Sequence, residues 1–271
     1  MKILSIDTDP LIEIPYFNAG RRAKDFYVDR LPVYRAIVDE LPESLDAMVV
    51  TADLQGLDID PMPGNVGLPL LGCTLPTKLE PILDGLDVCW NKVAALLAGD
   101  FYTYPDLHGR GGTGDVTEVW DAFADAYQWV VGVAGNHDTF GDRESYLPKM
   151  HSPDVHLLDA DRVEMAGLSI AGISGIIGNP RKNFRRDHYD FVETLDLILQ
   201  QPTDIALMHT GPDFPDLQGC KGVIEIREII EKRTPSIVVR GHCHWPQPLV
   251  QMDCGTQILN VDATTVILIR G

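Results

Sequence analysis

The chain has 271 residues, of which 40 are acidic and 22 are basic, so its formal net charge at pH 7 is −18. Proteins that bind nucleic acid need a basic face to neutralise phosphates, so this charge argues against nucleic acid as a partner. No apolar run approaches the roughly 18 residues of a membrane span, and the start of the chain lacks the basic segment and long apolar core of a signal peptide. We therefore expect a globular cytoplasmic protein without a membrane partner.

The cysteines indicate free thiols. There are five of them, an odd number, and no Cys-x-x-Cys pair is present. A disulfide framework and a thiolate zinc site are therefore both disfavoured, which agrees with a reducing compartment.

Apolar runs of strand length recur along the chain and alternate with helical patterns. The runs cover residues 2–6, 47–52, 93–99, 129–135, 168–175, 204–210, 236–241, 257–261 and 264–271. Helical spacing of apolar residues is present in 116–129, 191–200 and 223–232. This alternation predicts an α/β fold with much parallel sheet.

The domain organisation is expected to be simple. Residues 1–271 are predicted to form a single domain, to which residues 1–45 add a strand and a helix at one edge. The Pro/Gly-rich segment 58–76 and the segment 101–115 are predicted to be long loops, which in compact domains are often functional.

Potential metal ligands directly follow five of the apolar runs. In open α/β sheets, sites form outside the carboxyl ends of the strands, so we expect these side chains to meet. Mixed carboxylate, amide and imidazole donors suit Mn²⁺, Fe or Zn²⁺ better than Ca²⁺ or Mg²⁺, and the set is large enough for two ions that share a carboxylate. The residues are Asp53, Asp100, Asn136 with His137 and Asp138, His209, and the pair His242 and His244.

The order of four short motifs resembles that of the calcineurin-like metallophosphoesterases. The motifs are Gly-Asp at 99–100, Gly-Asn-His-Asp at 135–138, His209 after an apolar run, and Gly-His-Cys-His at 241–244. The resemblance extends from about residue 53 to the C-terminus. It implies two mixed β-sheets packed face to face with helices on the outside, a four-layer α/β/β/α sandwich, and a hydrolase of phosphoester bonds.

The resemblance also implies two divalent metal ions, Mn, Fe or Zn. Asp100 would bridge them, Asn136, His209 and His242 would complete one position, and Asp53 and His244 would belong to the other.

The same resemblance assigns roles to the rest of the Gly-Asn-His-Asp motif. His137 would not bind metal but would face the substrate phosphate as a general acid or charge stabiliser, and Asp138 would hold its other ring nitrogen. The implied reaction is attack on phosphorus by a hydroxide that bridges the two metals.

The first motif departs from the family pattern. The family usually has Asp-x-His-Gly, whereas this chain has Asp53-Leu54-Gln55-Gly56, so Gln55 stands where a histidine is expected. A glutamine carbonyl is a neutral and weaker donor, and it shifts the preference from zinc toward Mn²⁺ or Mg²⁺. Asp7 and Asp9, which follow the first apolar run, are an alternative first motif. Asp53 is favoured over them because its segment retains the glycine of the family motif, Gly56, and follows a run with a stronger strand pattern.

Several further residues are candidates for substrate binding, each with a purely structural alternative. The loop after Asp100 could form a wall of the site or simply pack through its aromatic residues. The basic run 179–186 could neutralise a phosphate or be a solvated helix entry, and the tryptophan after Gly-His-Cys-His could pack a substrate ring or cover the site. The candidates are Tyr102, His108, Arg110, Arg181 and Trp245.

The function predicted from these observations is hydrolysis of a phosphomonoester or phosphodiester of a small or nucleotide-like molecule. A protein Ser/Thr phosphatase is an alternative within the same family, and a nuclease is disfavoured by the charge. A non-catalytic metal-binding scaffold on the same fold is the alternative from another class. The presence of His137 together with nearly all the expected ligands argues against the scaffold.

Overall fold

The computed structural model describes residues 1–20, 25–61, 67–109, 111–141 and 151–271. Two large β-sheets form its centre. The ten-stranded sheet has the order β10 (His151–Ser152), β11 (Val155–Leu157), β8 (Trp129–Gly132), β6 (Val93–Leu97), β4 (Ala47–Ala52), β20 (Thr264–Arg270), β3 (Phe26–Val38), β2 (Ile12–Ala19) and β5 (Leu57–Asp58), and β1 (Ile3–Ile6) pairs with β3.

The second sheet has six strands. Their order is β12 (Asp161–Met165), β13 (Leu168–Ile173), β16 (Ile205–Met208), β17 (Ile237–Arg240), β19 (Gln257–Asn260) and β18 (Leu249–Gln251). Two short pairs stand apart, β7 (Gly114–Asp115) with β9 (Asp138–Thr139) and β14 (Ile176–Ile177) with β15 (Arg185–Arg186).

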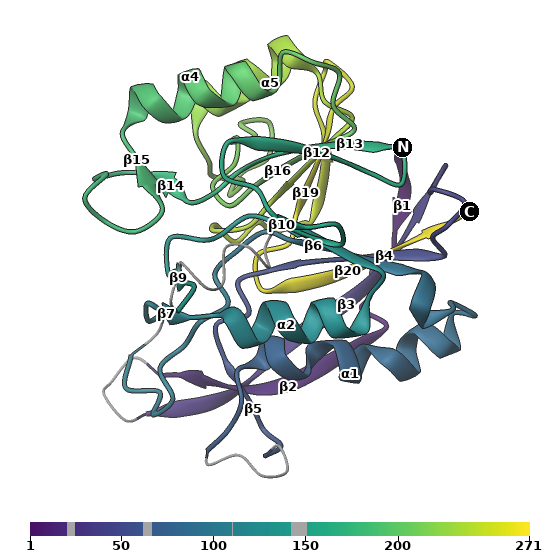
Figure 1. Cartoon of the computed structure of the whole chain (residues 1–271), viewed down its shortest axis with the longest axis vertical. Helices are drawn as coiled ribbons and strands as arrows, with labels where there is room; N and C mark the ends of the chain where they lie inside the picture. The colour runs from purple at the N-terminus through teal and green to yellow at the C-terminus, as the bar shows by residue number, and fades with distance from the viewer. Residues whose placement is uncertain (21–24, 62–66, 110, 142–150) are drawn as a thin grey trace.

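Helices cover the outer face of each sheet (Figure 1). They are α1 (Leu71–Gly85), α2 (Thr117–Ala126), α4 (His188–Ile198) and α5 (Ile224–Arg233), with a 3₁₀ turn η1 (Trp90–Lys92). The first two pack on the ten-stranded sheet and the last two on the six-stranded sheet. Among the described residues, no helix has the length and apolar character needed to cross a bilayer.

The strands alternate between two buried faces, which creates the four layers. In β4, Ala47 and Val49 point to the core under α1 and α2, whereas Met48 and Val50 point to the core between the sheets. Side chains on a strand point alternately to opposite faces, so a strand buried on both faces reads as a continuous apolar run. The predicted α/β fold of two face-to-face sheets with outer helices is confirmed.

The N-terminal segment differs from its prediction. The described part of residues 1–45 forms β1, β2 and β3 and contains no helix, so the predicted helix is wrong. The thirteen residues of β3 pair with β1, β2 and β20, which places this segment inside the sheet rather than beside it. Its buried residues fall in two pairs with a spacing of two, Leu31 with Val33 and Ala36 with Val38, which is the period of a strand.

The segment 58–76 also differs in part, because α1 already begins at Leu71. Two prolines, Pro76 and Pro81, lie inside this helix and obscured it in the sequence. Leucines at positions 71, 75, 79 and 83 form one buried stripe, and their packing against the sheet outweighs the cost of the prolines.

One ion-pair cluster joins the outer helices α4 and α5. The Asp196 carboxylate accepts hydrogen bonds from Arg233 Nε and Nη2, both at 2.8 Å, and from Lys232 Nζ. The Arg233 guanidinium and the Lys232 ammonium lower the pKa of Asp196 to about 2.

We expect Asp196→Asn to lower the free energy of unfolding at pH 7 by about 1 kcal/mol, the scale of a bidentate but partly solvated pair. Because the folded pKa lies below the unfolded one, this stabilisation is complete above pH 5 and is lost as the pH falls through about 2. Urea unfolding of both proteins between pH 7 and pH 3 tests this. A difference that stays constant below pH 4 would contradict it.

Candidate metal centre

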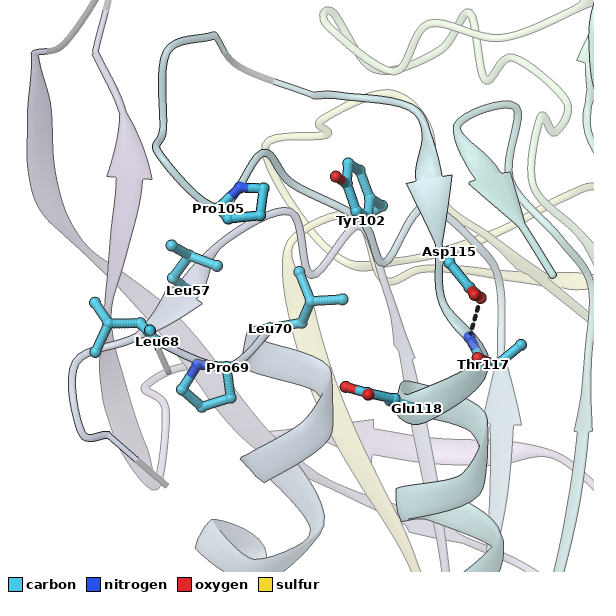
Figure 2. Close-up of a pocket in the computed structure, with 10 residues that line it drawn as sticks. Leu57, Leu68, Pro69, Leu70, Tyr102, Pro105, Asp115, Thr117 and Glu118 are labelled. Atoms are coloured by element: carbon cyan, nitrogen blue, oxygen red, sulfur yellow. Dashed lines mark hydrogen bonds between the residues drawn. The ribbon is translucent and has the colours of Figure 1, made fainter. Parts of the chain in front are cut away.

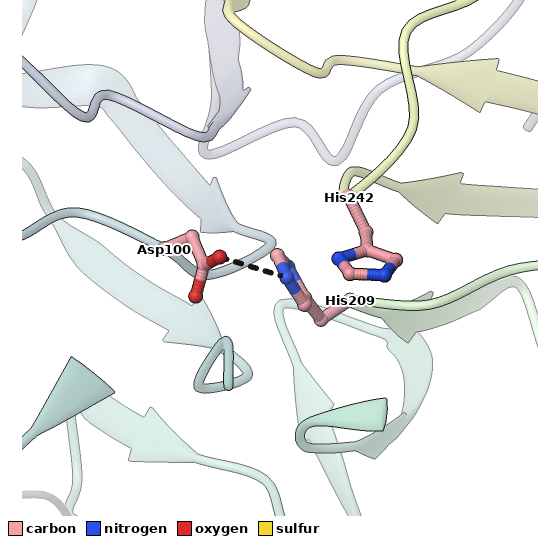
Figure 3. Close-up of side chains that lie close together, drawn as sticks. All are labelled: Asp100, His209 and His242. Carbon is pink, nitrogen blue, oxygen red and sulfur yellow. Dashed lines mark ion pairs between the residues drawn. The ribbon is translucent and has the colours of Figure 1, made fainter. Parts of the chain in front are cut away.

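Three residues that follow parallel strands form a compact group of metal donors. Asp100 comes after β6, His209 after β16 and His242 after β17. One donor atom from each lies within 4.8 Å of the others, and Asp100 Oδ2 is 3.3 Å from His209 Nε2 (Figure 3). The carboxyl ends of the two sheets therefore meet at this point, as the sequence predicts.

The backbone at the site is turned sharply. Asp53, Asp100 and His242 have φ values of 55°, 61° and 69°, in the left-handed region that residues with a side chain rarely adopt. Such conformations cost on the order of 1–3 kcal/mol each and occur mainly at functional sites. Here they direct three donor residues toward the same place immediately after their strands.

Two buried acceptor atoms at the site have no hydrogen-bond partner among the described residues. They are Asn136 Oδ1 and His209 Nε2. His209 Nδ1 lies 2.8 Å from the carbonyl oxygen of Ala98, so Nδ1 carries the hydrogen and donates it. Metal-binding histidines are commonly fixed in this way, with the other nitrogen left to the metal. The donors present therefore fit a divalent cation.

The charges of the site also call for a cation. Burial, together with the nearby charges of Asp262 and Asp100, raises the pKa of Asp53, although His209 opposes the rise. Burial would lower the pKa of His209, but the carboxylates of Asp100 and Asp53 outweigh it and raise that pKa to about 10. Buried carboxylates of like charge are stable together only with positive charge between them, which a divalent ion supplies.

The same surroundings also shift the pKa values of the neighbouring donors Asp100 and His242. Burial would raise the pKa of Asp100, but the His209 ring and the backbone N–H of His137 outweigh it and lower that pKa. Burial and the charge of His209 lower the pKa of His242 to about 4, so this imidazole is neutral at pH 7 and can donate its lone pair.

The Asp53-Leu54-Gln55-Gly56 segment lies at this site. Asp53 Oδ2 accepts a hydrogen bond of 2.9 Å from the backbone N–H of His242, and Gln55 Nε2 donates to Asp100 Oδ2 at 3.2 Å. The alternative first motif lies elsewhere, because Asp7 pairs with Arg35 on β3 and Asp9 is exposed. The geometry thus supports Asp53 as the first-motif aspartate.

His244 is placed less favourably than the other candidates. Its side chain is 80% exposed and is absent from the compact donor group. Its Nδ1 lies 3.5 Å from Asp262 Oδ2, a residue that the sequence reasoning missed. Asp262 directly follows the apolar run 257–261, so the rule that found the other candidates also applies to it.

Asp262 is held beside the Gly-His-Cys-His turn by one side chain. Asn260 Nδ2 donates to the carbonyl of Cys243, and Asn260 Oδ1 accepts from the backbone N–H of Asp262. Val261 N–H also donates to the carbonyl of Arg240 at the end of β17. The carboxylate of Asp262 therefore lies close to His244, and its charge acts on Asp53.

His137 is bound to the site through its backbone and oriented by a threonine. Its N–H donates to Asp100 Oδ1 at 2.9 Å, and its ring Nδ1 lies 3.3 Å from Thr113 Oγ1. The half-buried ring is therefore held from the loop before β7. The sequence left open whether this loop forms a wall of the site or only packs through its aromatic residues, and Thr113 itself was not singled out.

Asp138 has a role different from the one predicted. Its carboxylate accepts three backbone hydrogen bonds of 2.8 Å, from Asp100, Phe101 and Gly135. The prediction that Asp138 holds the His137 ring is therefore corrected, because both carboxylate oxygens are used to join two turns. Burial and the charge of Asp100 raise its pKa to about 6, which the three backbone donors oppose.

Tyr102 lines a cavity of about 490 Å³ beside the loop that carries Thr113 (Figure 2). Leu57, Leu68 and Leu70 form its apolar side, and Asp115 and Glu118 form its acidic side. The cavity suits an apolar or cationic group better than an anion. Tyr102 thus has a placement compatible with substrate binding.

The remaining substrate-binding candidates that the structure describes are not brought to the donor group. His108 is exposed and pairs with Asp106, and Arg181 is exposed. Arg110 lies outside the described residues. Trp245 is buried in the core under α4 and α5, where its Nε1 donates to the Lys221 carbonyl and Arg240 lies over its ring. Trp245 therefore packs the fold and does not face the donor group.

Comparisons with known proteins find solved structures of low sequence identity that cover most of the chain. The solved structure of TT1561 from Thermus thermophilus is 15% identical, has a TM-score of 0.55 and covers 81% of this chain and 90% of its own. That of the phosphopantetheinyl hydrolase PptH from Mycobacterium tuberculosis is 13% identical, with a TM-score of 0.43 and coverage of 80% and 89%. A search of curated proteins gives no match. The first of these likenesses shows a shared fold.

The family described as calcineurin-like phosphoesterase matches residues 48–246. This range contains Asp53, the Gly-Asp and Gly-Asn-His-Asp turns, His209 and the Gly-His-Cys-His turn, and it covers most of the chain. The chain belongs to the calcineurin-like phosphoesterases.

Proposed function

We propose that this protein hydrolyses a phosphoester bond of a small or nucleotide-like molecule with the help of two divalent ions. Membership of the family supports a metal-dependent phosphoesterase in general. The observation that carries the proposal for this chain is the meeting of Asp100, His209 and His242. The buried atoms Asn136 Oδ1 and His209 Nε2 have no hydrogen-bond partner among the described residues, and Nε2 lies only 3.3 Å from the Asp100 carboxylate.

The metal ions would be held by donors of two kinds. When bound, they supply positive charge that binds the phosphoryl oxygens and activates water for attack on phosphorus. The mixed oxygen and nitrogen donors favour Mn²⁺, Fe or Zn²⁺. The residues proposed to hold them are Asp53, Gln55, Asp100, Asn136, His209, His242 and His244.

His137 is proposed to act on the substrate. Its backbone N–H donates to Asp100 and its ring Nδ1 lies beside Thr113. No residue that the structure describes forms a hydrogen bond with Nε2, so this edge of the imidazole is proposed to reach a phosphoryl or leaving-group oxygen. In that position it would donate a proton to the departing oxygen or stabilise its charge.

The alternatives are a protein Ser/Thr phosphatase and a non-catalytic metal-binding scaffold. The cavity of about 490 Å³ that Tyr102 lines has the size of a small-molecule pocket and is compatible with an apolar or cationic part of a small substrate. Retention of His137, which has no role in holding metal, favours an enzyme over a scaffold. A cytoplasmic location remains a prediction from the sequence.

The first test is turnover by one preparation stripped of metal and then given Mn²⁺, Zn²⁺ or Fe²⁺ in turn. The substrates are an aryl phosphate monoester, an aryl phosphate diester, a nucleoside diphosphate and a phosphoserine peptide. We expect metal-dependent turnover of a small substrate, and His242→Ala to abolish it. Turnover of the peptide alone would favour the protein phosphatase, and no turnover with any metal would favour the scaffold.

We expect Asp262→Asn to weaken binding at one of the two metal positions by about 10- to 100-fold, the usual effect of removing a carboxylate that orients a metal-binding histidine. The reason is the 3.5 Å approach of Asp262 to His244 Nδ1. Metal content after dialysis against graded chelator measures it, with Asp253→Asn, an exposed acid after β18, as the control. The double variant with His244→Ala should show little further loss, because Asp262 acts through that histidine.

A further inference from the structure

A second cavity, of about 390 Å³, lies beside the basic run 179–186. Three cationic residues line it, Lys182, Arg185 and Arg186, together with the carboxylates of Asp159 and Asp190. The formal charge of its lining is therefore positive, in a chain whose net charge is −18. An anion that approaches this acidic protein needs such a local excess of positive charge.

The two carboxylates of the cavity are already occupied by one arginine. Arg186 Nη2 lies 3.0 Å from Asp159 Oδ1, and Arg186 Nη1 lies 3.2 Å from Asp190 Oδ2. Within the described part of the chain, Lys182 and Arg185 have no ion-pair partner, and the buried Arg185 Nε has no hydrogen-bond acceptor. A buried guanidinium nitrogen without an acceptor is costly, and an anion bound in this cavity would offset that cost by accepting a hydrogen bond from Arg185 Nε.

The topology places this cavity next to the metal centre. Asp159 lies shortly after β11 and Ser174 directly after β13, and both line the cavity. In the ten-stranded sheet β11 is the neighbour of β8, which leads to Asn136, and in the other sheet β13 is the neighbour of β16, which leads to His209. Neighbouring strands are about 4.8 Å apart, so residues that line the cavity follow strands one place away from those that lead to Asn136 and His209.

Hydrogen bonds fix the cavity wall to the turn that carries His137. Asn183 Nδ2 donates to the carbonyl of Asp138, and the N–H of Gly175 donates to the carbonyl of Ala134 at 2.7 Å. Ser174 Oγ accepts from the N–H of Ala134. In Figure 1, β14 and β15 lie on the same side of the molecule as β9, which begins at Asp138.

We infer that this cavity binds a second anionic group, a phosphate or a carboxylate, of the molecule whose phosphoester is cleaved at the metal centre. The inference rests on the proposed function and narrows its substrate class to phosphoesters with a distal anion. Lys182 and Arg185 supply the charge-assisted hydrogen bonds, which are the strong ones for phosphate and carboxylate. Arg186 is fixed by its two carboxylates and shapes the wall.

Alkanediol bisphosphates of increasing length test this proposal, with two matched series for comparison. One series replaces the distal phosphate by a carboxylate and the other by a hydroxyl group. We expect kcat/KM of the metal-loaded enzyme to be about 10- to 100-fold higher for the bisphosphate or the carboxylate of best length than for the hydroxyl compound. The preferred distal anion shows which of the two groups the cavity takes.

The double variant Lys182→Met, Arg185→Gln should reduce this preference at least tenfold, mainly through KM, with metal content retained. Lys92→Gln is the control, because Lys92 lies at the amino end of β6, away from the donor group. Hydrolysis of all three series at equal kcat/KM would overturn the inference and leave the proposed function standing. If no series is hydrolysed, calorimetric binding decides: bisphosphate and hydroxyl compound bound equally by the metal-loaded protein would overturn the inference.

Discussion

His137→Ala is expected to lower kcat for an alkyl phosphate by about 10²- to 10⁴-fold, the range for loss of a general acid. The metal content should not change, because the His137 ring is held by Thr113 and the contact with Asp100 is made by the backbone N–H, which alanine keeps. The ring is half-buried and close to the donor group without belonging to it.

The leaving group distinguishes the possible roles of this ring. A general acid matters most when the departing oxygen is strongly basic, so an alkyl phosphate should lose much more activity than a nitrophenyl phosphate. Equal losses for both would mean that the ring stabilises charge without transferring a proton. His188→Ala, at the exposed start of α4, is the matched control and should behave like the unmodified protein.

Asp138→Ala is expected to lower the free energy of unfolding by about 3–5 kcal/mol, because it leaves three buried N–H groups without an acceptor. Those N–H groups belong to Asp100, Phe101 and Gly135, so both turns of the metal centre relax and metal affinity should fall as well. A glycine at position 135 is required here, since a Cβ would collide with the carboxylate of Asp100.

Urea unfolding with and without Mn²⁺ measures both effects of this substitution. Asp187→Ala is the control: Asp187 caps α4 through one hydrogen bond to the Asp190 N–H, and its loss should cost about 1 kcal/mol. An Asp138→Ala protein that is as stable as this control and still holds two metals would show that the two turns do not depend on the carboxylate.

The positions of most metal-ligand candidates could be predicted because they depend on a local rule. Apolar runs mark strands that are buried on both faces, and the residue after such a strand lies at the carboxyl edge of the sheet. Asp100, His209 and His242 follow this rule and meet as expected. Asp262 also directly follows an apolar run, but it was not named as a candidate because it belongs to none of the four motifs.

The role of Asp138 could not be predicted, because its three backbone partners come from two turns that are far apart in the sequence. Side-chain orientation after a strand also depends on tertiary contacts, so the exposed position of His244 and the buried position of Trp245 were beyond a sequence pattern. Helix α1 was not predicted because Pro76 and Pro81 favoured a loop, although the leucines of this segment have helical spacing. Within the segment before residue 45, β2 and parts of β3 have the period of two that indicates a strand.

The central claim is that two divalent ions bind where the carboxyl ends of the two sheets meet. The number of metal ions bound per chain tests this claim most directly. The protein is loaded with Mn²⁺, passed through a desalting column and analysed for bound metal per chain, in parallel with Asp100→Asn. We expect about two ions in the unmodified protein and a loss at both positions in the variant, because Asp100 lies between Gln55 and His209. Equal metal content in the two proteins, or none in either, would contradict this account of the site.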